Sequence, residues 1–453
     1  MKKSYKKRTK QIKEERQILL DIGRLDDSLR GVAYIGAKRY AVSGALPKEK
    51  VAAIVTKTEN NVSYAEVKSV LEVSPYRVES PCKYFPRCGG CQLLHMDYEA
   101  GTRFKTALLR KRLLPLGFKE VSDCVSAGKA SCRNKVHIAF GKKSNGIDIG
   151  FFDDNSHKVI NTPSCPMHCD WYTDLVRILR EWVTEFGIFV YEPRTLKGHL
   201  RFAAARCLHG NIMLTIVSTI SAIKNLDELY NMLKVRFQKV SLWLNVNAEK
   251  TNEVMAGKLK HIAGDKKLSG NMLGVNFELG PKSFFQVNES MAETIYSKVV
   301  ELIKESGAEC VIDAYSGIGI TSALFAKTGI EVISVEIVPE AVQDARALCR
   351  NNKVSGVTHI CGDITKILPT LRPQGKTAFF VDPPRAGLGD EVAKTVSAFA
   401  PETILYLSCN PASLARDLYI FCDNGYQITS VTPYDMFPNT KHLETLVCMT
   451  RKS

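Results

Sequence analysis

Cys409, which is followed by Asn410 and Pro411, is the residue of this sequence best suited to covalent chemistry. The preceding residues, Glu402–Leu407, predict a short apolar strand, and the residues after Pro411 predict a helix whose first turn carries Ser413. Open α/β sheets bind ligands and carry out reactions at the carboxyl ends of their strands. A lone cysteine is more often a buried structural thiol, but the flanking motifs favour a nucleophile here.

A glycine-containing turn predicts a nucleoside cofactor site. Residues Asp313–Gly319, DAYSGIG, follow a predicted strand and open a predicted helix, so the backbone of Gly317 and Gly319 can approach a cofactor closely. The next predicted strand ends in Glu336, about 20 residues further on, where a ribose-binding carboxylate is expected. This spacing fits NAD and S-adenosylmethionine equally, so a dehydrogenase has to be considered.

Three further features favour the methyl donor over the dinucleotide. Ser322 stands where the dinucleotide fingerprint requires its third glycine. Asp363 follows the third predicted strand, in a position to bind an adenine amino group. Asp382 follows the fourth and precedes two prolines, and methyltransferases carry an acidic or amide residue before Pro-Pro at this place.

A second group of cysteines has the spacing of metal ligands. Cys82, Cys88 and Cys91 form C-x5-C-x2-C, and the intervening glycines let the backbone wrap closely around a ligand. Zinc and iron–sulfur sites both require a fourth ligand, and the chemistry of the thiols leaves both open. The candidates, in order of preference, are Cys165, then Cys169 and Cys132, and for zinc alone His95.

Composition indicates a globular protein with a polyanionic partner. The chain has 453 residues, of which 45% are hydrophobic and 24% charged, and this length predicts roughly three domains. It contains no apolar run long enough for a membrane helix and begins with a basic segment unlike a signal peptide, so we expect a cytoplasmic protein. The net charge of +15 favours a phosphate-rich partner. Fourteen cysteines in such a chain argue against a disulfide scaffold, and most of them are expected in the core.

The sequence predicts a multidomain α/β protein. Residues 1–18 form a basic tail, and 19–76 alternate in the manner of a small OB-like β-barrel. Residues 77–280 read as a mixed α/β central domain that contains the cysteine group and two basic strands, Ser131–Phe140 and Gly198–Arg206. Residues 281–453 alternate strands and helices as a Rossmann-like parallel sheet does. The expected strands are Cys310–Ala314, Glu331–Glu336, Val357–Cys361, Ala378–Val381, Thr403–Leu407, Gln427–Thr432 and Leu446–Thr450, with helices at Thr321–Lys327, Glu340–Asn351, Gly389–Phe399 and Pro411–Cys422.

Taken together, CGGC, DAYSGIG, DPPRAGL, SCNPASLARD and the His442-Leu-Glu444 segment resemble the RNA uracil-5-methyltransferases over nearly the whole chain. The resemblance is closest to the branch that methylates 23S ribosomal RNA and carries a TRAM domain and an iron–sulfur cluster. It implies a class I methyltransferase domain after residue 281 and a TRAM domain at 19–76. It also implies RNA as partner, with ribosomal RNA preferred over transfer RNA, and we expect a monomer that does not bind membranes.

The same resemblance implies roles for individual residues. Cys409 would be the nucleophile and Glu444 the base that removes a proton after methyl transfer. The groups that it places on the cofactors are, for S-adenosylmethionine, Gln286, Tyr315, Gly317, Gly319, Glu336, Asp363 and Asp382, and for a [4Fe-4S] cluster, Cys82, Cys88, Cys91 and Cys165.

Three other interpretations remain open. A carboxylate such as Glu444 can simply lie on the surface of an edge strand. The methyl acceptor could be a transfer RNA uracil, a cytosine or an exocyclic amine, although amine methylation needs no thiol. The chain could also be a non-catalytic RNA-binding iron–sulfur protein, against which the presence of both Cys409 and Glu444 argues.

Overall fold

The computed structural model describes residues 17–126, 128, 133–143, 146–154, 156–249, 251 and 253–452. Most of the predicted basic tail and the candidate ligand Cys132 lie outside these residues. The chain forms two compact units, one made of residues up to Ser80 with Gln92–Ala100, the other of Pro81–Cys91 and everything from Gly101 on. The finer domain boundaries expected from the sequence stay a prediction.

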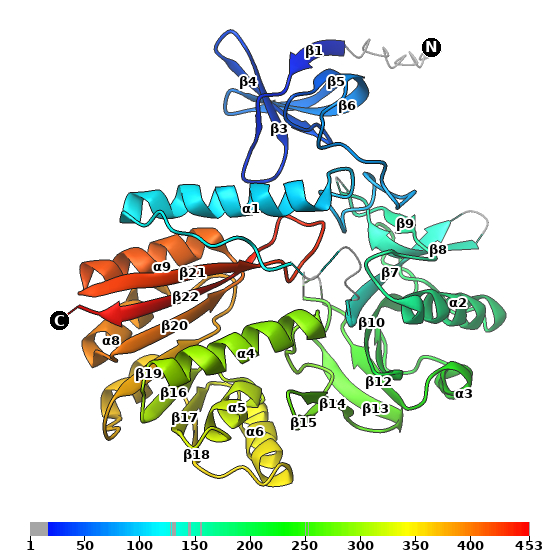
Figure 1. The fold of residues 1–453 in the computed structure, drawn as a ribbon. Helices are drawn as coiled ribbons and strands as arrows, with labels where there is room; N and C mark the ends of the chain where they lie inside the picture. Colours follow the sequence, from blue (N-terminus) through cyan, green and yellow to red (C-terminus); the bar gives the residue numbers. More distant parts are fainter. Residues whose placement is uncertain are drawn as a thin grey trace, which may run out of the picture. The chain divides into compact units, whose positions relative to one another are not determined.

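The first unit is built on a curled sheet that resembles half a barrel (Figure 1). Its spatial order is β1-β5-β6-β4-β3-β2, and the pairing of β5 with β6 shifts register at three places, which lets these two long strands bend. The expectation of a small β-domain with a barrel-like sheet is confirmed. Its assignment as a TRAM domain stays a prediction. Its strands are β1 (Gln17–Asp21), β2 (Arg24–Leu25), β3 (Gly31–Ile35), β4 (Lys38–Ser43), β5 (Lys50–Glu59) and β6 (Val62–Glu72).

The second unit begins with a seven-stranded mixed sheet in the order β13-β12-β11-β10-β7-β8-β9. Apolar side chains of β7, β10, β11 and β12 pack against α2 (Asp170–Glu185) and α3 (Leu226–Arg236), so these helices cover one face of the sheet. The strands are β7 (Lys135–Lys143), β8 (Gly146–Phe152), β9 (Val159–Asn161), β10 (Leu200–Leu208), β11 (Asn211–Ser218), β12 (Val240–Val246) and β13 (Lys258–Gly264). A separate hairpin follows, β14 (Leu268–Met272) with β15 (Val275–Leu279).

A second seven-stranded sheet, in the order β18-β17-β16-β19-β20-β22-β21, forms the rest of this unit. The five strands from β18 to β20 run parallel, and β22 returns antiparallel to β20. The order reverses between β16 and β19, which is the switch point where open α/β sheets bind ligands. The strands are β16 (Cys310–Ala314), β17 (Glu331–Glu336), β18 (Val357–Cys361), β19 (Thr377–Val381), β20 (Thr403–Ser408), β21 (Tyr426–Tyr434) and β22 (Glu444–Arg451), and every strand expected in this region is confirmed within a few residues at its ends.

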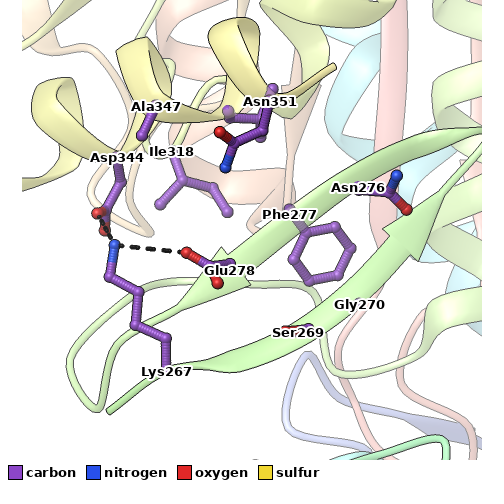
Figure 2. A pocket seen from close by; sticks show the side chains of 11 residues that line it. Lys267, Ser269, Gly270, Asn276, Phe277, Glu278, Ile318, Asp344, Ala347 and Asn351 are labelled. Atoms are coloured by element: carbon purple, nitrogen blue, oxygen red, sulfur yellow. Dashed lines mark hydrogen bonds and ion pairs between the residues drawn. The ribbon is translucent and has the colours of Figure 1, made fainter. Parts of the chain in front are cut away.

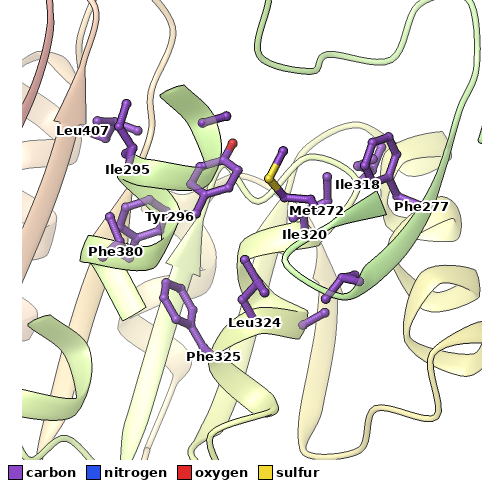
Figure 3. Packing of buried hydrophobic residues seen from close by; sticks show 14 of the residues in the cluster. Met272, Phe277, Ile295, Tyr296, Ile318, Ile320, Leu324, Phe325, Phe380 and Leu407 are labelled. Atoms are coloured by element: carbon purple, nitrogen blue, oxygen red, sulfur yellow. The ribbon is translucent and has the colours of Figure 1, made fainter. Parts of the chain in front are cut away.

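Helices cover both faces of this sheet. One face packs against α4 (Glu289–Glu305), α5 (Ile320–Ala326) and α6 (Pro339–Asn351), and Figure 3 shows this layer around Phe325 and Phe380, whose rings meet edge-on with centroids 5.5 Å apart. The other face packs against α7 (Ile364–Ile367), α8 (Gly389–Phe399), α9 (Pro411–Asp423) and part of α1 (Tyr98–Leu113). Burial on both faces explains why the central strands β16, β19 and β20 are mostly apolar along their length, whereas the edge strand β18 is partly exposed.

No helix among the described residues is both long enough and apolar enough to cross a membrane.

A buried ion pair fixes the loop that precedes β22. The ammonium of Lys105, on α1, contacts the carboxylate of Asp435 and donates a hydrogen bond to the carbonyl oxygen of His442 at 3.2 Å. Both charged side chains are almost completely excluded from solvent, at 2% and 1% exposure. Nothing in the sequence pattern indicated this pair, because its members lie far apart in the chain.

We predict that Lys105→Met lowers the free energy of unfolding by about 3–5 kcal/mol, because it leaves the Asp435 carboxylate buried without a counter-charge. The double variant Lys105→Met/Asp435→Leu should recover most of this loss, since both charges are then gone. Urea denaturation measures both. The control is Arg177→Met, which breaks the exposed Arg177–Glu181 pair and should cost less than about 1 kcal/mol. A double variant no more stable than Lys105→Met would contradict this account.

Candidate active site

Cys409 lies in the short turn between β20 and α9. The side chain of Asn410 caps the helix by accepting a hydrogen bond from the backbone N–H of Ala412 at 3.1 Å, and its amide donates to the carbonyl oxygen of Arg385 at 3.0 Å. Ser413 donates to the same carbonyl oxygen at 3.2 Å. The turn that carries Cys409 is therefore fixed to the loop after β19, which carries Asp382.

Glu444 starts β22, the strand that pairs with β20. In the antiparallel register Ser408 lies opposite Thr445, so the next residues outward, Cys409 and Glu444, lie at the same end of the two strands. Glu444 is only 2% exposed, and β22 lies between β20 and β21, so the interpretation as a surface carboxylate on an edge strand is wrong. Its Oε1 has no hydrogen-bond partner among the described residues.

Burial dominates the protonation of these two groups. Burial, together with the neighbouring carboxyls of Glu444 and Asp382, raises the pKa of the Cys409 thiol to about 11, and Arg385 opposes this shift. Burial and the neighbouring Asp382 also raise the pKa of Glu444 well above its usual range. Because Glu444 also raises the pKa of Cys409, the thiol and a carboxyl of raised pKa lie close together in a buried region.

Asp382 extends this acidic group toward the predicted cofactor residues. Its Oδ2 accepts a hydrogen bond from the side-chain amide of Gln286 at 3.1 Å. Burial, assisted by Asp313, raises the pKa of Asp382 to about 7. Tyr296 of α4 lies next to Gln286 and in the electrostatic field of Asp382 and Glu444. The structure thus brings Gln286, Asp382, Cys409 and Glu444 together, and it adds Tyr296, which the motifs did not indicate.

The glycine turn has the strained geometry that a close backbone approach requires. Tyr315, Gly317 and Gly319 all have positive φ angles, of 59°, 54° and 80°. A positive φ at a tyrosine is a genuine outlier, and such outliers cluster at functional sites. A Cβ on Gly319 would lie 2.8 Å from the Cβ of Ala345 on α6, so this position admits glycine for two reasons.

The two remaining predicted cofactor carboxylates also support local backbone. Glu336 accepts hydrogen bonds from the backbone N–H groups of Gly317 and Val338, each at 2.9 Å. Asp363 caps α7 by accepting from the backbone N–H and hydroxyl of Thr365 through Oδ1, which keeps its pKa low. These bonds do not use Oδ2 of Asp363. Glu336 is the last residue of β17 and Asp363 follows β18, so both lie at the carboxyl ends of strands in the sheet that carries Gly317, as the sequence predicted.

Two other contacts of the site were not evident from the sequence. The guanidinium of Arg385 lies 2.6 Å from Nδ1 of His442, and burial together with this cation lowers the pKa of His442 to about 4, so the imidazole is neutral and accepts. The buried carboxylate of Asp417 accepts from the backbone N–H of Leu388 and the hydroxyl of Tyr406, both at 2.7 Å. Asp417 thereby anchors α9 to the loop after β19. It lies within the SCNPASLARD motif, which was the available signal.

The four predicted cluster cysteines are brought into mutual electrostatic range. The thiol of Cys91 interacts with those of Cys165, Cys88 and Cys82, and burial raises its pKa to about 12. Cys165 interacts with Cys88 and Cys82, and lies 3.3 Å from Nδ1 of His168. The alternative ligand Cys169 is disulfide-bonded. Among the described residues, no three His, Cys, Asp or Glu side chains are close enough to hold a single metal ion.

A cavity of ≈ 240 Å³ lies between the β14–β15 hairpin and α6 (Figure 2). Ile318, inside the glycine turn, and Phe277 contribute apolar surface to it. On its polar side the ammonium of Lys267 binds Asp344 at 2.6 Å and Glu278 at 4.0 Å, so the charges there are already paired. The cavity touches the glycine turn but none of the other predicted site residues.

Comparison with known proteins gives consistent matches. A family model described as tRNA (uracil-5-)-methyltransferase matches residues 370–452, which include Asp382, Cys409 and Glu444. An uncharacterized RNA methyltransferase from Clostridium tetani is 35% identical over 428 residues, 93% of both chains, and one from Listeria innocua is 32% identical over 448 residues, 97% of this chain and 99% of its own. The fold matches the crystal structure of Pyrococcus abyssi tRNA (uracil-54, C5)-methyltransferase in complex with S-adenosyl-L-homocysteine, with TM-score 0.77, 24% identity and coverage of 96% and 100%.

We predict that Gly319→Ala weakens binding of S-adenosyl-L-homocysteine at least about tenfold, because the new methyl group collides with Ala345 and displaces the turn. Gly317→Ala is the matched control, because its new Cβ would meet nothing within 4 Å. This variant therefore measures the cost of the positive φ angle without a steric collision. Isothermal calorimetry measures both. The double variant Gly319→Ala/Ala345→Gly removes the collision and should bind like Gly317→Ala; equal losses in all three variants would contradict the steric argument.

Proposed function

Because the chain belongs to the RNA uracil-5-methyltransferase family, we propose that it methylates carbon 5 of a uracil in 23S ribosomal RNA, using S-adenosylmethionine as the donor. That it is an RNA methyltransferase follows from the family itself. The observation that carries the finer proposal is the placement of the Cys409 thiol and the buried Glu444 carboxyl at the same end of two paired strands.

Each residue has a defined task in this reaction. Carbon 5 of uracil is a weak nucleophile, so the Cys409 thiolate first forms a bond to carbon 6, and the ring electrons move toward the carbon-4 oxygen as in an enolate. When bound, the methyl donor would supply an electrophilic methyl group to carbon 5; the bond from this methyl to the sulfonium sulfur would break, and S-adenosyl-L-homocysteine would leave. Glu444 then takes the proton from carbon 5, the carbon 5–carbon 6 double bond re-forms, and the thiolate of Cys409 leaves.

The protonation of the site suits this sequence of steps. The raised pKa of Glu444 makes its carboxylate a stronger base than an exposed glutamate, as removal of a carbon-bound proton requires. The guanidinium of Arg385 is the neighbour that lowers the pKa of the Cys409 thiol and so favours the thiolate. The hydrogen bond from Gln286 orients Asp382 beside both groups. The target base must leave its stack to reach Cys409, as in other enzymes that modify bases.

For the methyl donor we propose the contacts expected from the sequence. The backbone of Gly317 and Gly319 and the side chains of Gln286, Tyr315 and Asp382 would surround the methionine part. Glu336 would bind the ribose through lone pairs that its backbone contacts leave free, and Asp363 would use Oδ2 for the adenine amino group.

We further propose that Cys82, Cys88, Cys91 and Cys165 hold a [4Fe-4S] cluster. The donor set fits in its chemistry, because the four half-buried thiols lie within electrostatic range of one another, and burial raises the pKa of three of them, Cys88, Cys91 and Cys165. The backbone N–H groups of Gly90 and Met167 lower the pKa of Cys88 and Cys165, and the cation of Arg133 lies near Cys91 and Cys165. These groups favour thiolates and a bound cluster of negative charge.

Transfer RNA is the alternative substrate. The family model and the solved structure of matching fold both carry names of transfer RNA uracil-5 methyltransferases. The preference for ribosomal RNA rests on the resemblance of the first unit to a TRAM domain and on the cysteine group.

We predict that the wild type, given S-adenosylmethionine, releases tritium from carbon-5-labelled uridine in unmodified ribosomal RNA, and that Cys409→Ala releases none. Unmodified transfer RNA in the same assay decides between the two substrates. Glu444→Gln should stall after methyl transfer and accumulate a protein–RNA adduct that withstands denaturing electrophoresis, because carbon 5 keeps its proton. Absence of release from both RNAs by folded, donor-binding protein would refute the proposed reaction.

We predict that protein purified without oxygen contains iron and acid-labile sulfide in equal amounts, and that Cys165→Ala loses most of both. Elemental analysis and the visible absorption spectrum provide the measurement. Cys361→Ala is the control, because this thiol is exposed and outside the group, and it should keep the full iron content. Zinc in place of iron in the wild type would contradict the cluster assignment.

A further inference from the structure

One face of the central sheet carries two cations directly opposite each other. Lys135 on β7 pairs in register with Arg206 on β10, and His137 pairs with Ala204. The intervening residues of both strands point into the core beneath α2 and α3, so Lys135 and Arg206 lie on the face that these helices leave uncovered. Figure 1 shows β7 and β10 side by side in this sheet.

These two cations lack an anionic partner. Neither forms an ion pair within the described part of the chain. Arg206 is only 6% exposed, and its Nη1 is buried there without a hydrogen-bond partner. The carboxylate in their vicinity is Glu289, which is occupied by the side-chain amide of Asn134 and by the imidazole of His209, both at 3.3 Å. Two facing cations without an ion-pair partner are costly, so an anion that bound beside them would be stabilised.

The same cations adjoin the loop that carries Gln286. Arg206 donates to the carbonyl oxygen of Ser283 at 3.4 Å, and its guanidinium lies over the ring of Phe285, 5.6 Å from the centroid. Asn134, immediately before Lys135, donates to the carbonyl oxygen of Gln286 at 3.1 Å. An anion on this pair would therefore be held close to the segment that contacts Asp382.

We propose that Lys135 and Arg206 form a binding site for a backbone phosphate of the RNA substrate, near the nucleotide that enters the active site. The half-buried ammonium of Lys135 makes the direct contact, and Arg206 behind it supplies the second positive charge and links the phosphate to the 283–286 loop. The inference rests on the proposed function in taking RNA as the ligand, and it adds a phosphate-binding site that the motifs do not contain.

The test compares Lys135→Gln with Lys142→Gln in the full-length protein. Lys142 is an exposed lysine on the same strand, at a position on the opposite face of the sheet. Lys142→Gln therefore removes one positive charge, as Lys135→Gln does, but leaves the proposed site intact. We expect Lys135→Gln to weaken binding of a fluorescent oligouridylate about tenfold, as loss of one charge-assisted contact does. The slope of log affinity against log salt should fall by about 0.7, the value for one phosphate contact on a single strand. Lys142→Gln should leave the slope unchanged.

The pH dependence gives a second readout. Burial and the facing Arg206 lower the pKa of Lys135 to about 8, with His137 and, beside Arg206, Glu289 as the other ionisable neighbours. RNA affinity should therefore be complete below pH 8 and fall as the pH rises through it, because the ammonium is lost. Lys135→Arg keeps a charge at every such pH and should bind well with a flat profile.

Equal affinities and salt slopes for wild type and Lys135→Gln would overturn the proposal. Inorganic phosphate at matched ionic strength is the second probe. If inorganic phosphate binds at Lys135 while RNA affinity does not depend on Lys135, the site binds free phosphate and not the RNA backbone, and the proposal fails. Binding is measured without turnover, so a negative tritium-release assay would remove the proposed reaction and leave this comparison valid.

Discussion

The antiparallel pairing of β20 with β22 is the constraint on which the chemistry of this protein depends. A parallel sheet gathers the carboxyl ends of its strands at one edge, and there it places Asp313, Asp382 and Cys409. Because β22 runs in the opposite direction, its first residue, Glu444, reaches the same edge. The two residues proposed as base and nucleophile, Glu444 and Cys409, thus come from different parts of the chain to the same edge of the sheet.

This arrangement concentrates acidic groups in a water-poor space, and the surrounding structure keeps them there. Burial raises the pKa values of Asp313 and Asp382 to about 6 and 7, so both are held against their preference for solvent. Hydroxyl donors on α5 bind Asp313, and Gln286 binds Asp382. The Lys105–Asp435 pair and the bonds of Asp417 then fix the two segments that flank the site. The cost of burying these carboxyl groups is therefore offset by hydrogen bonds and ion pairs of residues that have no proposed role in the reaction.

The sequence predicted the last third of the fold well and the site in part, for identifiable physical reasons. The bounds of β16, β17 and β18 were predicted as the structure has them, because each is a short run rich in β-branched residues between turn signals, and β16 is also buried along its whole length. From the sequence, Glu444 could be either a buried base or a surface carboxylate on an edge strand. Its burial depends on the order of β20, β22 and β21, which no local sequence pattern reveals. The remaining contacts, such as those of Lys105 and Asp417, follow from long-range packing and not from periodicity.

Charge explains why a site of this kind needs cations beside it. Where they are ionised, the carboxylates of Asp313 and Asp382 repel a phosphodiester, so positive charge close to the point of base insertion would favour the entry of an RNA strand. A cation paired within the protein is largely neutralised toward a ligand, whereas an unpaired one keeps its field. The 283–289 segment connects the two regions, because Gln286 binds Asp382 on one side and Ser283 accepts from Arg206 on the other. The proposed phosphate site and the Asp382 carboxyl are therefore joined by hydrogen bonds to the same short loop.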